Sequence, residues 1–501
     1  MQTSNSLWSR SMNRIFGQSK SSSAPTKGRQ SCRRTRRLVL ESLENREVFA
    51  ADFDSVLGIG GDDATGSSGV SSVATDLVGN TYTTGRFSGT VDFDPGVGES
   101  IRVARGVHDI FVAKYHPGGA LNWVQQLGGD ESSPGGTDSG LGIAVGNSGS
   151  VYVSGRFQSF TQIGSFVFTS TAFSGGFVTK LDASGNVAWA KQTESIAVSV
   201  GVDASENVVV LSQSKQINIV KYSSSGSLTW SKSIASNDSL GSNLAVDAPG
   251  NVFVHGTFRG TVDFDPSSRL RFVSSGPSHS SFTLKLDSKG GFKWVSPFVG
   301  QSIGGSSGSS RSGDIGLDAS GNILVGGFFQ GTVDFNPSTA VTTLSNLSVS
   351  SGSYVTKLNS SGGLVWAKAL LPTLNSSTFL GNSGMVLGEL DVDSTGNVYV
   401  VGSFWGTVDF NPGSAVELRS SSSPVNGFVV KLNAAGDFVW VETLAGEGNS
   451  SIVDVSVDAA GMLQLGGNYS GNVDFDPNPL SNKTLPSGPM RRGFLLRLRQ
   501  R

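Results

Sequence analysis

After residue 50, short apolar runs alternate with polar turns along almost the whole chain. The runs consist of Val, Ile, Phe, Tyr and Leu, and clusters of Gly, Ser, Asn and Asp separate them. Such runs predict β-strands, while long stretches with the 3.6-residue period of an amphipathic helix are absent. The pattern therefore predicts an all-β protein with many tight turns. The composition agrees, since the chain has 67 glycines and only 15% charged residues.

One strand pattern recurs seven times and ends each time in a basic residue. These residues are Lys114, Lys180, Lys221, Lys285, Lys357, Lys431 and Arg497. A tryptophan stands nine residues after each of the first six, at Trp123, Trp189, Trp230, Trp294, Trp366 and Trp440. The constant spacing predicts a repeated hairpin in which the cation and the indole lie opposite each other. A lysine ammonium over an indole face, worth about 0.5–1 kcal/mol when exposed, would help to fix the hairpin register.

Each repeat has a second pair of strands upstream, joined by a turn that resembles D-x-x-G-N, as in LDVDSTGNVYVVG from Leu390. Each repeat thus has four strands, here named a, b, c and d in chain order. The shortest repeat, from Lys180 to Lys221, spans 41 residues, which matches the ~40–45 residues of a four-stranded propeller blade. Seven such units predict blades arranged around an axis.

The seventh repeat lacks a strand d, and the N-terminal part of the body supplies a candidate. The segment from Phe53 to Asp63 aligns with the segment from Leu121 to Glu131. A strand from the N-terminus that completes the last blade would leave no open sheet edge. We therefore expect a seven-bladed β-propeller of four-stranded antiparallel blades over residues 51–501. Because Ser55 takes the tryptophan position, the last blade should be the least well packed.

The repeat signatures, such as GNVYVVG and FVVKLNAAGDFVW, resemble those of bacterial SBBP-type β-propeller repeat proteins over residues 53–499. The resemblance implies a propeller fold and an extracellular or envelope setting. It implies no activity, because that family is defined by its repeat pattern.

Residues 1–50 differ from the rest of the chain and form a basic leader. They carry ten Lys or Arg and three Glu, whereas the remainder carries 27 Lys or Arg and 36 Asp or Glu. The string RRLVLESLENREVFA resembles the leader of exported planctomycete proteins, which implies a disordered or cleaved segment and a protein that is secreted or held in the cell envelope. The alternative is a disordered basic tail, because an apolar run of three residues is short for a secretory signal.

The net charge, the length of the apolar stretches and the cysteine content argue against several classes of protein. An acidic body, with a net charge of −9, argues against nucleic acid as a partner. No apolar stretch approaches the ~20 residues of a membrane-spanning helix. Cys32 is the single cysteine and lies in the leader, so no disulfide is expected in the body.

Five repeats carry a G-[TN]-V-D-F-[DN]-P segment between strands b and c. Its oxygen-bearing pairs are Asp92 and Asp94, Asp263 and Asp265, Asp334 and Asn336, Asp409 and Asn411, and Asp474 and Asp476. Oxygen ligands two residues apart on an extended chain suit calcium. An Asp or Asn before Pro is also ordinary turn chemistry. We expect structural turns and no cofactor, with calcium as the alternative.

No catalytic motif is visible, so no catalytic residue is assigned. The four histidines, His108, His116, His255 and His279, do not recur at ligand spacing and are expected in loops or on the surface. A glycosidase-like pair of carboxylates would leave no local signature, because its members can lie far apart in sequence. A carbohydrate-active enzyme therefore stays open as a third possibility.

Loop lengths place the expected function on one face. The a–b and c–d turns are short, whereas the b–c loops and d–a connections are long and variable. Loops on a rigid scaffold are the usual place for recognition. We expect a non-catalytic binding or scaffolding module that contacts protein or polysaccharide through the long-loop face, with a purely structural surface protein as the alternative. Trp405 and Phe379 are candidate contacts, although packing under a long loop is the favoured explanation for both.

Overall fold

The computed structural model describes residues 51–60, 66–129, 136–170, 174–213, 216–235, 240–303, 306–346, 350–373, 383–478, 480–486, 488 and 490–500. The chain divides into Met1–Val48 and Phe49–Arg501, and the described residues belong to the second unit. The expected leader, residues 1–50, lies outside them. Across the described ranges every regular element is a β-strand, and no helix is present that is long and apolar enough to cross a membrane.

The strands form four-stranded antiparallel units, as the repeats predict. Five are separate sheets and two are runs within a twelve-stranded sheet, counted over the described residues. In the order a, b, c, d the first four units are β2 (Ser67–Thr75), β3 (Thr81–Ser88), β6 (Asp109–Tyr115), β7 (Leu121–Leu127); β8 (Ser139–Val145), β9 (Val151–Phe157), β12 (Gly175–Leu181), β13 (Val187–Thr193); β14 (Ile196–Val202), β15 (Val208–Gln213), β16 (Gln216–Tyr222), β17 (Leu228–Ala235); and β18 (Leu240–Val246), β19 (Val252–Phe258), β22 (Ser280–Leu286), β23 (Phe292–Ile303).

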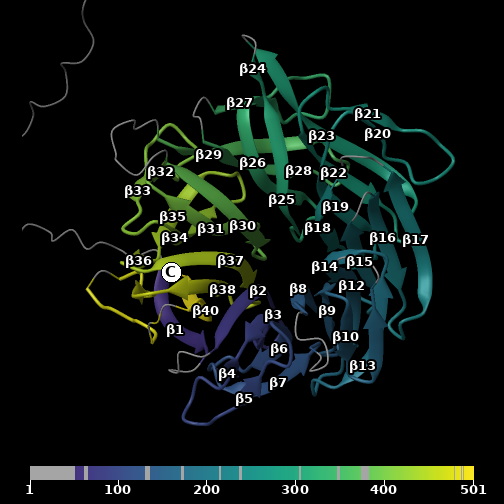
Figure 1. Cartoon of the computed structure of the whole chain (residues 1–501). Helices are drawn as coiled ribbons and strands as arrows, with labels where there is room; N and C mark the ends of the chain where they lie inside the picture. Colours follow the sequence, from purple (N-terminus) through teal and green to yellow (C-terminus); the bar gives the residue numbers. More distant parts are fainter. Residues whose placement is uncertain are drawn as a thin grey trace, which may run out of the picture. The chain divides into compact units, whose positions relative to one another are not determined.

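The remaining units follow the same order. They are β25 (Ser309–Leu317), β26 (Ile323–Asp334), β28 (Gly352–Leu358), β29 (Leu364–Pro372); β30 (Gly384–Val392), β31 (Val398–Trp405), β34 (Asn426–Leu432), β35 (Phe438–Thr443); and β37 (Asn449–Val457), β38 (Met462–Ser470), β40 (Arg492–Gln500), β1 (Ala51–Ile59). In the last unit the fourth strand comes from the start of the body. Figure 1 shows the purple β1 alongside the yellow β40.

The a-strands of successive units pack against one another. β2 contacts β8, β8 contacts β14, and the series continues through β18, β25, β30 and β37, which contacts β2 again. No described sheet closes on itself through hydrogen bonds. Side chains join neighbouring units, and the fourth and fifth units are also joined by the pairing of β23 with β26. Between the last and first units, for example, Leu495, Ile59 and Val70 belong to one buried cluster. We call the seven a-strands together the inner edge.

The predicted hairpin register is confirmed in all six Lys–Trp repeats. Lys180 pairs with Trp189 and Lys357 with Trp366, and the other four pairs align in the same way. The predicted stacking of lysine on the indole is wrong. In four repeats the ammonium lies instead over an aromatic ring of strand b, for example 5.0 Å from the ring centroid of Tyr82 for Lys114. Strand b pairs with the other side of strand c. The aromatic ring on strand b presents its face to the lysine ammonium, whereas the indole does not. Lys221 and Lys357 have no aromatic residue opposite them on strand b and form ion pairs with Asp203 and Asp318.

The indoles are used to join one unit to the next. Trp123 Nε1 donates to the carbonyl of Ala183, in the c–d turn of the following unit, at 3.1 Å. The same bond joins four more pairs, Trp189–Ser224, Trp230–Ser288, Trp294–Ser360 and Trp366–Ala434. The turn must carry glycine here: at Gly185, with φ of 87°, a Cβ atom would lie 2.8 Å from the Trp123 ring.

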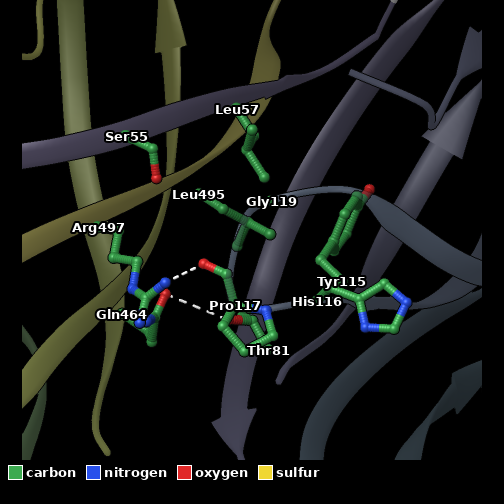
Figure 2. Close-up of a pocket in the computed structure, with 10 residues that line it drawn as sticks. All are labelled: Ser55, Leu57, Thr81, Tyr115, His116, Pro117, Gly119, Gln464, Leu495 and Arg497. Atoms are coloured by element: carbon green, nitrogen blue, oxygen red, sulfur yellow. Dashed lines mark hydrogen bonds between the residues drawn. The ribbon is translucent and has the colours of Figure 1, made fainter. Parts of the chain in front are cut away.

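The junction between the last and first units departs from this pattern. Ser55 lies opposite Arg497, as the sequence alignment predicts. Arg497 takes over the role of the missing indole, because its guanidinium donates to the carbonyl of Pro117 in the c–d turn of the first unit (Figure 2). A cavity of about 10 Å³ stays beside them, about the room that one water needs. The buried Gln464 Nε2 at its wall has no hydrogen-bond partner, so this junction is incompletely packed.

Candidate functional site

The long-loop face carries an open cavity of about 280 Å³ where the first, second and last units meet. Its wall consists of Ser67, Ser68, Gly69, Val70 and Ser71 from the start of β2, Ser139 and Leu141 from the start of β8, Arg86, Arg156, His108 and Arg491. Strands a begin and strands b end at this face, where the long d–a and b–c connections lie. We call it the arginine cavity.

Two of its three arginines occupy the same position in neighbouring repeats. Arg86 is the sixth residue of β3, and Arg156 is the sixth residue of β9. The register confirms the equivalence, because Arg86 lies opposite Gly69 and Arg156 opposite Ser139, each near the start of strand a. The other five repeats have Gln213, Thr257, Phe328, Ser403 and Asn468 at this position. Arginine at this position is therefore confined to the first two of the three units that line the cavity.

Side chains at this position of strand b point toward the a-strand of the next unit. In the last unit Asn468 Oδ1 accepts the N–H of Val70 at 3.0 Å. In the fourth unit Thr257 Oγ1 accepts the N–H of Ser312 at 2.9 Å. Both residues thus satisfy a backbone donor on the neighbouring edge strand, where a free N–H would otherwise face no acceptor. An arginine has no acceptor, so it has no such role in the first two units.

The arginines of the cavity have no partner in the described part of the chain. Arg86, Arg156 and Arg491 form no ion pair there, and their side chains make no hydrogen bond to described residues. Two buried nitrogens in the wall, Arg156 Nε and His108 Nδ1, lack a hydrogen-bond partner. Three cations are thus held together without a described counter-charge.

The carboxylates next in sequence to the cavity are occupied by other donors. Asp109 accepts the N–H groups of Arg105 and Gly106 and the side chain of Gln126. Asp138 accepts the N–H of Gly129 at 3.0 Å and the hydroxyl of Thr161 at 2.8 Å. Neither carboxylate neutralises the arginines.

The electrostatics of the cavity favour an anion. Burial lowers the pKa of the His108 imidazole, and the positive charges of Arg86 and Arg156 lower it further, while Asp109 opposes them. Burial also lowers the pKa of the Arg491 guanidinium, with a contribution from Arg86. The positive charge of each guanidinium group thus makes it more costly for a neighbouring group in the cavity to be protonated. The site is therefore electropositive within a body of net charge −9.

Acidic side chains gather on a different part of the inner edge. Each of the seven a-strands has a register shift at the same place. The residues at or directly after it are Ser72, Gly142, Ser199, Asn243, Asp314, Glu389 and Asp454. Three consecutive units thus carry Asp314, Glu389 and Asp454, which we call the carboxylate cluster.

The carboxylate cluster is bonded to the backbone of the inner edge. Asp314 Oδ2 accepts the N–H of Leu390 in β30 at 2.8 Å, and Asp454 Oδ2 accepts the N–H of Val73 in β2 at 2.7 Å. Glu389 is hydrogen-bonded to Asp454. Asp314 and Asp454 are 4% and 2% exposed. These acids hold neighbouring edge strands together.

Burial keeps protons on the cluster. It raises the pKa of Asp314 to about 8, with smaller contributions from the charges of Asp454 and Asp391. Burial also raises the pKa of Glu389 well above its ordinary value, and the nearby Asp454 and Asp314 add to the rise. Burial raises the pKa of Asp454 as well. Glu389 and Asp454 share a hydrogen bond that requires a proton.

The predicted calcium candidates lie in hydrogen-bonded turns. Asp92 Oδ1 accepts the N–H groups of Asp94 and Ser100. Asp263, Asp334, Asp409 and Asp474 accept equivalent pairs. Asp94, Asp265 and Asp476 accept the N–H two residues further on. This is the turn chemistry expected from Asp and Asn. Among the described residues no group of three acidic or histidine side chains is arranged to hold a metal ion; calcium stays a prediction for titration.

Three further residues were named in the sequence analysis as a loop or surface histidine, His255, and as candidate contacts, Trp405 and Phe379. His255 is not in a loop: it is fully buried in β19. Its nitrogens lie 3.2 Å from Thr283 Oγ1 and 3.0 Å from Tyr354 Oη, and these partners let a neutral imidazole replace an apolar core residue. Trp405 lies at the end of β31 and packs over Gly384. Phe379 lies outside the described residues.

The comparison with known proteins finds similar folds only. No family model matches the chain, and no curated protein matches it. Among solved structures, BamB from Moraxella catarrhalis is 13% identical, with a TM-score of 0.41 over 89% of this chain and 99% of that one. The Dos1 propeller is 9% identical, with a TM-score of 0.42 over 89% and 95%. The Pan2 WD40 domain of Neurospora crassa is 8% identical, with a TM-score of 0.42 over 89% and 96%.

Proposed function

We propose that the body is a seven-bladed β-propeller of the SBBP type and that it serves as a non-catalytic binding or scaffolding module, secreted or held in the cell envelope. The seven four-stranded units and the contact of β37 with β2 support the blade count and a circular order. The pairing of β1 with β40 supports closure by the N-terminal strand. In this arrangement the first fifty residues are the export leader.

The arginine cavity is the observation that carries the binding function. It opens on the long-loop face, it lies between two a-strands, and its cationic side chains have no described partner. Guanidinium groups that have no described partner in an open cavity are available for charge-assisted hydrogen bonds to a partner molecule. The partner, a protein or a polysaccharide, contacts this face.

The carboxylate cluster is the observation that favours the alternative, a carbohydrate-active enzyme. A retaining glycosidase needs two carboxyl groups about 5 Å apart with the sugar between them, and an inverting one needs a wider gap. Glu389 and Asp454 are instead hydrogen-bonded to each other, and Asp454 also bonds to Val73. These contacts engage both carboxyl groups and support a structural role.

The binding function is tested with the full-length chain on an array of cell-surface polysaccharides and purified envelope proteins. The double variant Arg86→Glu/Arg156→Glu reverses the charge of the long-loop face. The control Lys289→Glu reverses a charge in an exposed c–d turn on the opposite face. Binding that the double variant weakens and the control preserves supports the proposal. Binding that both variants weaken equally, or no binding at all, contradicts it.

The location is tested separately. A reporter fused behind residues 1–55 should leave the cytoplasm in a host with the corresponding export system. A reporter that stays wholly in the cytoplasm contradicts the proposed setting.

A further inference from the structure

We infer that the arginine cavity is an oxyanion site that takes a tetrahedral, doubly charged group, a phosphate or a sulfate. This inference deepens the proposed function, on which it rests, by naming the chemistry of the group that the long-loop face recognises.

The geometry supplies a built site. Arg86 and Arg156 reach the cavity from the ends of β3 and β9, and Arg491 reaches it from the residue before β40. The three side chains thus come from three different units, so the ordered body holds them in place. The backbone fixes the same region: Ser68 N–H donates to the carbonyl of Arg491 at 3.2 Å, and Gly493 N–H donates to Ser68 Oγ at 2.9 Å.

The donors match a tetrahedral oxyanion better than a carboxylate. A guanidinium presents N–H groups in a planar fork, and no arginine can accept a hydrogen bond. Three such forks offer more donors than the two oxygens of one carboxylate can take, whereas a phosphate or sulfate presents three or four oxygens. Hydroxyls in the wall, such as that of Ser71, add donors that suit either ion.

The charge and size of the cavity also favour a tetrahedral oxyanion. Three guanidinium groups face no described carboxylate, so a dianion leaves less excess charge than a monoanion. Charge-assisted hydrogen bonds of this kind are among the strongest in proteins. A volume of about 280 Å³ is larger than one oxyanion requires, which leaves room for the group that carries it. Phosphate monoesters, which keep two negative charges, therefore fit as well as the free ions.

The test is calorimetric titration of the full-length chain at constant ionic strength with inorganic phosphate, sulfate and acetate. We expect phosphate and sulfate to bind at least tenfold more tightly than acetate. Arg86→Gln and Arg156→Gln should each weaken phosphate binding at least tenfold, whereas the control Lys289→Gln should not. Glutamine is the residue that the third repeat has at this position, so these variants are expected to fold.

Methyl phosphate, which keeps two negative charges, separates the two sources of the group. Ester binding as tight as that of the free ions identifies a terminal group on a larger molecule, and ester binding more than tenfold weaker identifies a free ion; both results support the oxyanion site. Equal binding of acetate, no measurable heat with any anion, or phosphate binding that both arginine variants retain overturns it. If the array experiment still shows binding that depends on the long-loop face, the inference fails while the proposed function stands.

Discussion

The arginine cavity and the carboxylate cluster lie on the same inner edge and hold their charges in opposite ways. Each acid of the cluster is engaged by a neighbour: Asp314 by Leu390 N–H, Asp454 by Val73 N–H and Glu389 by Asp454. The cavity arginines have no described partner. Charge on the inner edge is therefore structural where the backbone satisfies it and available to a ligand where it does not.

The difference follows from edge-strand chemistry. Each a-strand is the last strand of its sheet, so some of its N–H groups have no strand to bond to. Acceptor side chains such as Asp, Asn, Ser and Thr can satisfy these donors, whereas arginine cannot. An arginine at the end of strand b that faces the inner edge thus gives up a stabilising contact, and we attribute it to recognition.

The largest expected effect comes from removing an acid of the cluster. Asp454→Ala leaves the Val73 N–H without its acceptor and Glu389 without its hydrogen-bond partner. We expect a loss of about 3 kcal/mol in the free energy of unfolding, because buried groups are left unsatisfied. Urea unfolding followed by tryptophan fluorescence measures it.

The matched variant is Arg86→Ala in the arginine cavity. Because Arg86 has no described partner, its removal should change the free energy of unfolding by less than about 1 kcal/mol. A larger loss in Arg86→Ala than in Asp454→Ala would break the comparison.

The second effect is a fall in stability as the pH rises from 7 to 9. Burial raises the pKa of Asp314 to about 8, far above the ~3.9 of an unfolded Asp. Between these two pKa values the folded state keeps a proton that the unfolded state has released, so the free energy of unfolding falls by up to about 1.4 kcal/mol per pH unit as the pH rises, and the fall levels off above the folded pKa. Below about pH 6.5 His255 acts in the opposite sense, because burial lowers its pKa to about 3.

Glu389→Gln sharpens this test. The amide keeps a hydrogen-bond donor toward Asp454 but does not titrate. The melting temperature of the variant should fall less between pH 7 and 9 than that of the wild type, and the variant should be the more stable of the two at pH 9. Parallel curves would show that Glu389 does not take part in the proton sharing.

The third effect is small. Arg86→Gln/Arg156→Gln removes two unpartnered cations and copies Gln213 of the third unit. The free energy of unfolding should stay within about 0.5 kcal/mol of the wild type, as for substitutions that break no contact. A loss of more than about 2 kcal/mol in chemical denaturation would show that the arginines have a structural partner.

The smallest effect is local and concerns His108. The positive charges of Arg86 and Arg156 help to hold its pKa down. A bound anion supplies the opposite charge, so phosphate should raise the His108 pKa by about 1 unit or more. NMR titration of the imidazole with and without phosphate measures this. The rise should disappear in the double arginine variant, and a rise of equal size there would place the anion elsewhere.

Much of the fold follows from repetition in the sequence. The fixed spacing of cation and tryptophan predicts the c–d hairpin and its register, and the alignment of Ser55 with the tryptophans predicts the pairing of β1 with β40. The partner of the lysine side chain is not predicted. It depends on strand b, which is distant in sequence but adjacent in the sheet.

The candidate site was harder to predict for the same reason. Arg86 and Arg156 are 70 residues apart, and the packing of β2 and β3 against β8 brings their units together. A signal was present: when the seven b-strands are aligned, two neighbouring repeats have Arg where the others have none. His108 and Arg491 carry no such signal, because they lie just outside the repeated strands.

The central claim is that Arg86 and Arg156 together hold a tetrahedral anion. Crystals of the chain soaked in selenate, a sulfate analogue with a strong anomalous signal, test it most directly. The account predicts an anomalous peak within hydrogen-bonding distance of both guanidinium groups and none at that place in crystals of Arg86→Gln/Arg156→Gln. An empty cavity in the wild type, or a peak that persists in the double variant, would contradict it.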